Sequence, residues 1–324
     1  MITLDKMKII APLECVTVIR QEAFESKIRN GVTISTSYTQ TKPYMLYLEI
    51  DYEEQESVIE FSGKILGDRY PELINTDNIR ECFEHINNMG LCQLNVDMIL
   101  EYGRVCVIDI TKDVHYADAA NLSEWLRTHI VNHRKYLARN VSGNLIIEKN
   151  VKTRAYKRRL TVYDKEKEMQ RADNQEFMAS ITDPARMLAH FNGKIRFEYN
   201  LNSMIAIRKV LKISDTSIHE IFSSAASPIY DFVNGIIVED NGADSTLLSW
   251  SDRKKLAFLR DCDMDMPKVE AEIRKYVSGS HQLRTIGQYR ELLSRLNEKG
   301  RDLKKTLLGL LLESIIIFPL LLPL

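Results

Sequence analysis

The alternation of polar and apolar residues in the first two thirds of the chain predicts antiparallel strands. Between residues 30 and 65 the segments VTISTSYTQ, YMLYLEI and SVIEFSGK alternate in this way and are rich in β-branched and aromatic residues. A period of two is typical of strands that bury one face and expose the other. We expect one strand to end at Ser62-Gly63-Lys64, and further strands at 104–113, 144–149, 158–164 and 194–201.

Apolar residues spaced three and four apart predict helices elsewhere. One such stripe predicts a helix over 77–89, and another predicts a helix over 119–139, directly after the strand at 104–113. From residue 213 onward the helical pattern dominates, and the helices expected there cover 253–260, 267–276 and 288–296.

These elements predict an α+β fold, in which an antiparallel sheet with flanking helices is followed by a helical C-terminal domain. A chain of this length is expected to form two domains. The predicted boundaries are 1–212 for the catalytic sheet domain, 213–305 for the helical accessory domain and 306–324 for an apolar tail.

The composition is that of a folded globular protein. The 324 residues are 44% hydrophobic and 27% charged, which excludes a disordered, fibrous or coiled-coil chain. Because the net charge is −1, any affinity for nucleic acid must come from a local cluster of Lys and Arg. The five cysteines include no C-x-x-C pair, which indicates neither a disulfide framework nor a cysteine zinc site.

The two ends of the chain bear on its location. The first residues, MITLDKMKII, contain charged groups where a secretion signal needs an apolar stretch, so we expect a cytoplasmic protein. The tail TLLGLLLESIIIFPLLLPL is apolar, but it contains Glu313 and is interrupted by Pro319 and Pro323. We therefore do not expect it to cross a membrane.

Three of the expected strands carry reactive side chains on one face, because side chains alternate along a strand. Asp109 and Asp113 share a face of one strand, Glu198 lies on the polar face of another, and Tyr163 neighbours Lys165 on a third. If these strands are adjacent, the three carboxylates form an all-oxygen site suited to Mg²⁺ or Mn²⁺. A tyrosine beside a cation and an ammonium can attack a phosphodiester, which gives a covalent phosphotyrosine.

A run of basic residues leads into the strand of Tyr163. It contains no acidic residue, so it is suited to bind the phosphates of the strand being cut, and its tyrosine can stack on an unpaired base. The predicted DNA-binding residues are Lys149, Lys152, Arg154, Tyr156, Lys157, Arg158 and Arg159.

Four segments in fixed order, SGK, VCVIDITKD, LTVYDKEKE and KIRFEYNL, resemble the replication initiator family (gene II/X-like) of filamentous phages and rolling-circle plasmids. The resemblance covers roughly residues 55–212. Each motif is short, but agreement in both order and spacing is much more specific than any single motif.

The resemblance implies an enzyme of a bacterial cytoplasm that nicks one DNA strand at a replication origin, single-stranded at the nick, and later rejoins it. It implies Tyr163 as the nucleophile and Lys165 as its supporting cation. It also implies metal-associated carboxylates at Asp109 and Glu198, with Asp113 matching a second aspartate of the plasmid branch. A host helicase and a polymerase are candidate partners, and no oligomeric state follows from the resemblance.

Two features depart from the pattern of the relatives. Val107 stands where relatives often carry arginine, so the phosphate contact expected there would fall to Arg104. None of the seven histidines forms an H-x-H pair, so the metal ligands must be carboxylates.

The same residues also have simpler interpretations. Strand tyrosines mostly pack or hydrogen-bond, and the chain has fourteen tyrosines. Asp109 and Asp113 can instead end a strand and cap the next helix, and Glu198 can pair with Arg196 on a solvated face. The alternative function is therefore a non-catalytic origin-binding protein with the same fold. A tyrosine recombinase is disfavoured, because we find no Arg, His-x-x-Arg and Tyr set.

Overall fold

The structure is a computed structural model that describes residues 2–316 apart from 118, 120–121, 123–125, 127–129, 132–134, 154–156, 237, 240–248 and 298–302. The chain divides into two compact units. Unit 1 consists of Met1–Ala119 and Val151–Ile229, and unit 2 consists of Ala120–Asn150 and Tyr230–Leu324.

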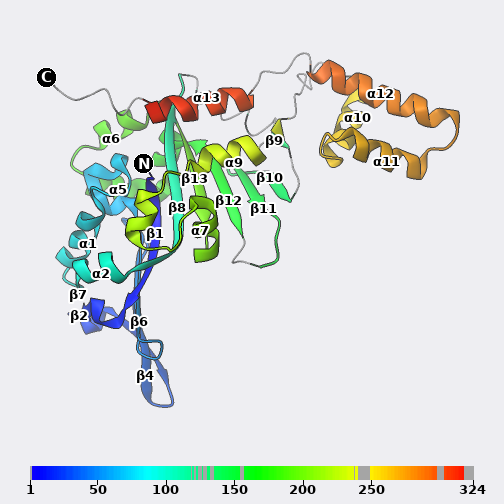
Figure 1. The fold of residues 1–324 in the computed structure, drawn as a ribbon. Coiled ribbons are helices and arrows are strands. Elements are labelled where there is room, and N and C mark those ends of the chain that lie inside the picture. Colours follow the sequence, from blue (N-terminus) through cyan, green and yellow to red (C-terminus); the bar gives the residue numbers. More distant parts are fainter. Residues whose placement is uncertain are drawn as a thin grey trace. The chain divides into compact units, whose positions relative to one another are not determined.

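Unit 1 is built on an antiparallel sheet with the strand order β12-β13-β8-β1-β6-β5-β4-β3 (Figure 1). The central strand β8 pairs with β1 on one side and with β13 on the other. The strands are β1 (Leu4–Pro12), β3 (Glu25–Arg29), β4 (Val32–Gln40), β5 (Leu46–Asp51), β6 (Glu56–Ser62), β8 (Arg104–His115), β12 (Arg158–Asp164) and β13 (Lys194–Leu201).

The strands form where the sequence alternates. In β5, for example, Leu46, Leu48 and Ile50 are buried while the residues between them are partly exposed. This is the pattern expected when one face of a strand is packed against a core. The strands predicted between residues 30 and 65 and at 104–113, 158–164 and 194–201 are confirmed, and β6 ends at Ser62 as expected.

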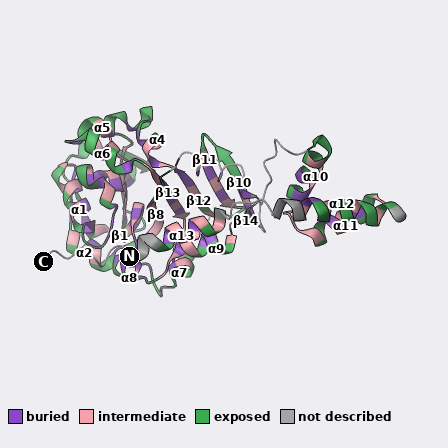
Figure 2. Cartoon of the chain, turned by 90° about the horizontal axis from the view of Figure 1, so that it is seen from above, coloured by how far each residue is buried: buried purple, intermediate pink, exposed green. Residues whose placement is uncertain are grey.

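Helices cover both faces of this sheet. Seen from above, α4, α5 and α6 lie on one side of β8 and β13, and α2, α7 and α8 lie on the other (Figure 2). The α-helices of unit 1 are α1 (Ile79–Asn88), α2 (Val96–Tyr102), α4 (Lys165–Met169), α5 (Gln175–Ser180), α6 (Pro184–Phe191), α7 (Met204–Leu211) and α8 (Ile218–Ser223). The 3-10 helices are η1 (Leu13–Cys15), η2 (Gln21–Ala23), η3 (Gly63–Glu72) and η5 (Ala172–Asn174), and a small ladder joins β2 (Val16–Val18) to β7 (Cys92–Leu94).

Unit 2 combines short strands with a helical cluster. The hairpin of β10 and β11 turns at Ser142 and Gly143, both of which have positive φ. A cluster of buried apolar side chains, including Leu256, Val269 and Ile286, joins α10, α11 and α12. The elements are β9 (Ile130–Val131), β10 (Tyr136–Val141), β11 (Asn144–Lys149), β14 (Val238–Glu239), α10 (Trp250–Asp261), α11 (Met266–Tyr276), α12 (Ser280–Asn297) and α13 (Leu303–Ile316), and α9 (Pro228–Ile236) begins at the end of unit 1.

The chain therefore has the predicted α+β fold with a helical C-terminal region. One predicted helix is partly wrong: Ala119, Leu122 and Leu126 are helical, but β9 and β10 occupy the second half of 119–139. Pairing of β10 with β11, a contact between separate segments, overrides the helical spacing there.

The predicted domain boundaries stay a prediction, although the contacts group residues 213–229 with the sheet and 120–150 with the C-terminal helices. The apolar tail begins inside α13, and residues 317–324 lie outside the described part. Among the described residues, no helix has the length and apolar character needed to cross a membrane.

The helical cluster gives a stability prediction. Leu259 is fully buried in this cluster, so Leu259→Ala should lower the free energy of unfolding by about 2–5 kcal/mol, measured by urea titration. Leu283, in α12, is 75% exposed, so Leu283→Ala is the matched control and should change it by less than about 0.5 kcal/mol. Equal losses in the two variants would contradict this assignment of the core.

Candidate active site

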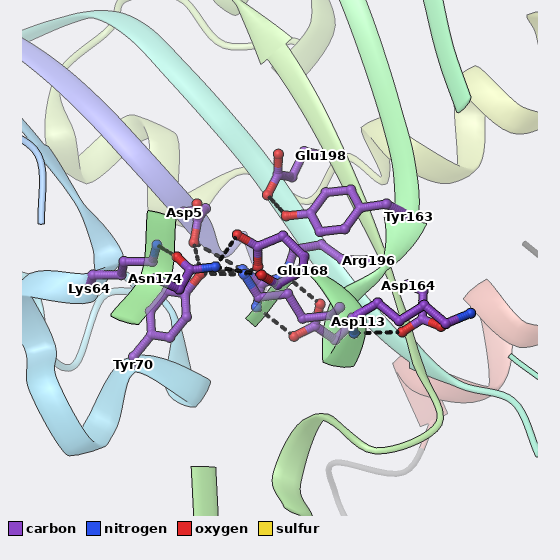
Figure 3. Close-up of polar contacts among 12 residues, drawn as sticks. Asp5, Lys64, Tyr70, Asp113, Tyr163, Asp164, Glu168, Asn174, Arg196 and Glu198 are labelled. Carbon is purple, nitrogen blue, oxygen red and sulfur yellow. Dashed lines mark hydrogen bonds and ion pairs between the residues drawn. The ribbon is translucent and has the colours of Figure 1, made fainter. Parts of the chain in front are cut away.

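The polar face of the sheet gathers side chains from four strands. In the register of the strands, Arg196 of β13 lies opposite Tyr163 of β12 and opposite Asp113 of β8. Cross-strand partners point to the same face, so these three side chains form one row. Glu198 is two residues further along β13, and the close-up shows Tyr163 pointing toward it (Figure 3).

Tyr163 is bonded to Glu198. Its phenolic hydroxyl donates a hydrogen bond to Oε1 of the carboxylate, and only 6% of Tyr163 is exposed. Burial, followed by the negative charge of Glu198, raises the pKa of Tyr163 well above its usual value. The predicted nucleophile therefore lies on the same face as the predicted acids, as a neutral phenol with a carboxylate as its proton acceptor.

Glu198 is itself perturbed. Burial, and then repulsion from the carboxylate of Asp5, raise the pKa of Glu198 to about 7. A carboxylate that titrates near neutral pH can both accept and return a proton under physiological conditions.

Arg196 is the most deeply buried charge in this group, with no exposed surface. Its Nε and Nη2 donate to the two carboxylate oxygens of Asp113 at 2.7 and 2.8 Å. Its Nη1 donates to Oδ1 of Asp5 at 3.0 Å and to the hydroxyl of Tyr70 at 2.7 Å. Burial alone would raise the pKa of Asp113, but the guanidinium lowers it below its usual value.

Lys165 is not on the strand of Tyr163, as the sequence had suggested. The strand β12 ends at Asp164, whose side chain caps the N-terminus of α4, and Lys165 is the first residue of that helix. Its ammonium nevertheless lies 5.8 Å from the centre of the Tyr163 ring.

The ammonium of Lys165 already has partners. It is 1% exposed, donates to the Tyr70 hydroxyl at 2.9 Å and forms an ion pair with Glu168. Burial, and then the charge of Arg196, lower the pKa of Lys165, whereas Lys165 lowers the pKa of Glu168 to about 2 against the effect of burial.

Sequence reasoning missed two residues of this site, Asp5 and Tyr70. A β-bulge between Leu4 and Lys6 inserts Asp5 as an extra residue of β1, and its Oδ1 accepts a bond of 2.9 Å from the Tyr70 hydroxyl. Bulges re-aim side chains in this way beside functional sites. Nothing in the sequence marks the bulge.

The only sequence signal for Tyr70 is the SGK segment that precedes it in the chain. A Cβ placed on Gly63 would lie 3.4 Å from the Asp5 carbonyl oxygen and 3.6 Å from the Tyr70 ring. The second residue of that segment thus lies directly against the two residues that sequence reasoning missed.

The predicted metal ligands do not meet at one point. Asp109 lies opposite Asn200 and accepts its amide bond, Glu198 lies opposite Thr111, and Asp113 is held by Arg196. Each step of two residues along a strand separates side chains by about 7 Å, too far for one cation to bind all three. Within the described part of the chain, no three His, Cys, Asp or Glu side chains form a group that could hold a metal ion.

The basic run is distributed over several segments. Lys149 is the last residue of β11 in unit 2, whereas Lys152 and Lys157 lie in the segment before β12 in unit 1. Arg158 and Arg159 begin β12, and Arg159 is exposed on the same face as Tyr163, opposite Asn200. Arg154 and Tyr156 lie outside the described residues.

Comparison with known families decides the affiliation of this region. Residues 74–219 match the family model for the N-terminal part of the replication-associated protein encoded by phage gene II. This segment belongs to that family. The match includes three of the four motifs, and it confirms the resemblance to gene II-like replication initiators. No curated protein and no solved structure matches the chain.

Loss of the Asp113 carboxylate should be costly, because it leaves the charge of Arg196 buried and partly unpaired. We expect Asp113→Ala to lower the free energy of unfolding by about 3–5 kcal/mol in chemical denaturation. The matched control is Asp97→Ala, which removes a pair between Asp97, 82% exposed, and the half-exposed Arg80, and should cost about 0–1 kcal/mol. Similar losses for the two variants would show that Arg196 does not depend on Asp113.

The raised pKa of Glu198 predicts a pH dependence of stability. The folded state holds this proton up to about pH 7, whereas the carboxyl in the unfolded chain loses it near its model value of 4.5. The stabilisation is therefore complete below pH 4.5 and is lost as the pH rises through 7. In Glu198→Gln this dependence should disappear, so that the variant gains at most about 3 kcal/mol on the wild type between pH 4.5 and 8. Parallel stability curves for the two proteins would contradict the shift.

Proposed function

We propose that this replication-associated protein is a rolling-circle initiator that nicks one DNA strand at an origin and later rejoins it through Tyr163. The observation that carries the proposal is the hydrogen bond from the Tyr163 phenol to Glu198, on a sheet face that also holds two buried cations. The family of the matched segment supports a role in DNA replication.

In this mechanism Glu198 takes the proton of Tyr163 as the phenolic oxygen attacks the phosphorus atom. A bond forms between that oxygen and phosphorus, the bond from phosphorus to the 3′ oxygen breaks, and the proton on Glu198 passes to the leaving 3′ oxygen. The product is a phosphotyrosine and a free 3′ hydroxyl that a polymerase can extend. Rejoining runs the same steps in reverse.

The cations beside Tyr163 stabilise the charge that develops on its oxygen. Arg196 opposes the rise in the pKa of Tyr163, and the ammonium of Lys165 lies beside the ring. Both are already held by carboxylates or by Tyr70, so we assign them to the nucleophile rather than to the DNA phosphate. Binding of the DNA backbone falls to the basic run, of which Arg159 lies nearest to the site.

Two requirements accompany the mechanism. Because Tyr163 is 6% exposed, residues that cover it must move before a phosphodiester can reach its oxygen. Mg²⁺ or Mn²⁺ remains the expectation from the family resemblance, and Asp109, Asp113 and Glu198 do not fit one ion in the described arrangement. We therefore assign no step to a metal.

The second candidate is an origin-binding protein without catalysis. It is favoured by the same burial of Tyr163 and by the absence of a common carboxylate site among the described residues. The two candidates differ in whether a covalent protein–DNA product forms.

The test is a nicking assay on supercoiled DNA that carries the origin, with Mg²⁺ or Mn²⁺ present. The wild type should yield relaxed circles with protein attached through a bond that resists detergent, and Tyr163→Phe should lower this yield by more than about 10³-fold. Tyr102→Phe, which alters a tyrosine that is 49% exposed on α2, is the matched control and should retain full activity.

Two outcomes would overturn the assignment. An attached protein in Tyr163→Phe at the wild-type level would place the nucleophile elsewhere. Binding without any covalent product in the wild type would support the non-catalytic alternative.

A further inference from the structure

We infer that the exposed face of α12 in unit 2 binds duplex DNA by entering the major groove. This surface, which we call the α12 face, consists of His281, Leu283, Arg284, Gly287 and Gln288. The inference concerns a second contact with DNA, and it does not depend on the chemistry of Tyr163.

The opposite side of α12 is committed to the core of the helical cluster. Ile286 and Leu292 are buried in the cluster with α10 and α11, and the ring of Tyr289 packs on Phe258. The α12 face is left uncovered by the residues that the structure describes. Spacings of three and four residues place His281, Arg284 and Gln288 along one side of the helix.

The side chains of this face have no partners to explain them. Arg284 and Gln288 form no hydrogen bond or ion pair with any described residue, and Leu283 is 75% exposed. Arginine reads guanine, glutamine reads adenine, and an apolar side chain contacts the methyl group of thymine in the major groove. The set therefore matches the edges of base pairs.

Gly287 supports close approach by a partner. It lies in the interior of an 18-residue helix, where glycine is among the least favourable residues, and a Cβ placed on it would meet nothing within 4 Å. Packing inside the chain thus gives no reason for a glycine here. The bare backbone lets another molecule come nearer to the helix than any side chain would allow.

The charge of the surrounding chain selects a polyanion as the occupant. Residues 273–290 contain four cations and no Asp or Glu, in a protein that has 45 acidic residues in all. Three of the cations contact acidic side chains of α11, and Arg284 contacts none among the described residues. Cations around a helix that faces outward supply the phosphate contacts that position such a helix on a duplex.

The test measures duplex binding by the full chain. A duplex enriched by the wild type from a randomised pool serves as the probe, and an unrelated duplex of equal length serves as the reference, both at one fixed salt concentration. Arg284→Ala should weaken binding to the enriched duplex by about tenfold or more, with a much smaller effect on the reference duplex.

Gly287→Leu separates contact from folding. Leucine favours helices and has open space here, so the variant should melt at the wild-type temperature or above it while its binding to the enriched duplex is lost. Lys209→Ala, which removes an exposed cation of α7 in unit 1, is the control for loss of one charge and should bind normally.

The outcomes are distinguishable from those of the nicking assay. Tyr163→Phe should bind the enriched duplex like the wild type, because the α12 face is intact. Wild-type binding by both Arg284→Ala and Gly287→Leu would overturn the inference, as would a pool from which no duplex is enriched.

Discussion

The permanent charge of Arg196 is the constraint on which the centre of unit 1 depends. A guanidinium cannot lose its proton in a protein, so burial without partners would cost several kcal/mol. Asp113 on β8, Asp5 on β1 and Tyr70 on η3 meet this requirement together. One buried side chain of β13 thereby fixes how two neighbouring strands and a 3-10 helix present their polar groups to the sheet face.

Charge balance then explains the state of Glu198. The buried or partly buried cations of the cluster are matched by three carboxylates, in pairs that the described residues complete: Arg196 with Asp113 and Asp5, and Lys165 with Glu168. Glu198 forms no ion pair within the described part of the chain, and it lies near a further negative charge, Asp5. It is therefore the carboxylate that retains a proton up to about pH 7 and the one that the phenol of Tyr163 can use as an acceptor.

The sequence was sufficient to predict the sheet, its polar face and the location of Tyr163 and Glu198 on that face, because alternation along a strand determines all three. It could not show which cation each carboxylate binds. Arg196 occupies a position of the polar face that alternation marks as solvated, yet it is buried, since α4 to α6 cover that face. Asp5 required a bulge, and Lys165 required the strand to end at Asp164. Both depend on contacts between segments distant in the chain.

The same arrangement accounts for how a tyrosine can be both protected and reactive under the proposed mechanism. Desolvation keeps the Tyr163 phenol neutral, so the free protein holds no exposed phenolate. Glu198 is close enough to take the proton, and its pKa near 7 makes the transfer less unfavourable than it would be to an ordinary carboxylate near pH 4. The cost of removing the proton falls further when the cations beside the ring face a negative oxygen in place of a neutral one. The reactivity of Tyr163 is thus set by buried neighbours that do not themselves need to contact DNA, which is why a search for free cations and an open metal site in the sequence identified the correct face but assigned different roles to the residues on it.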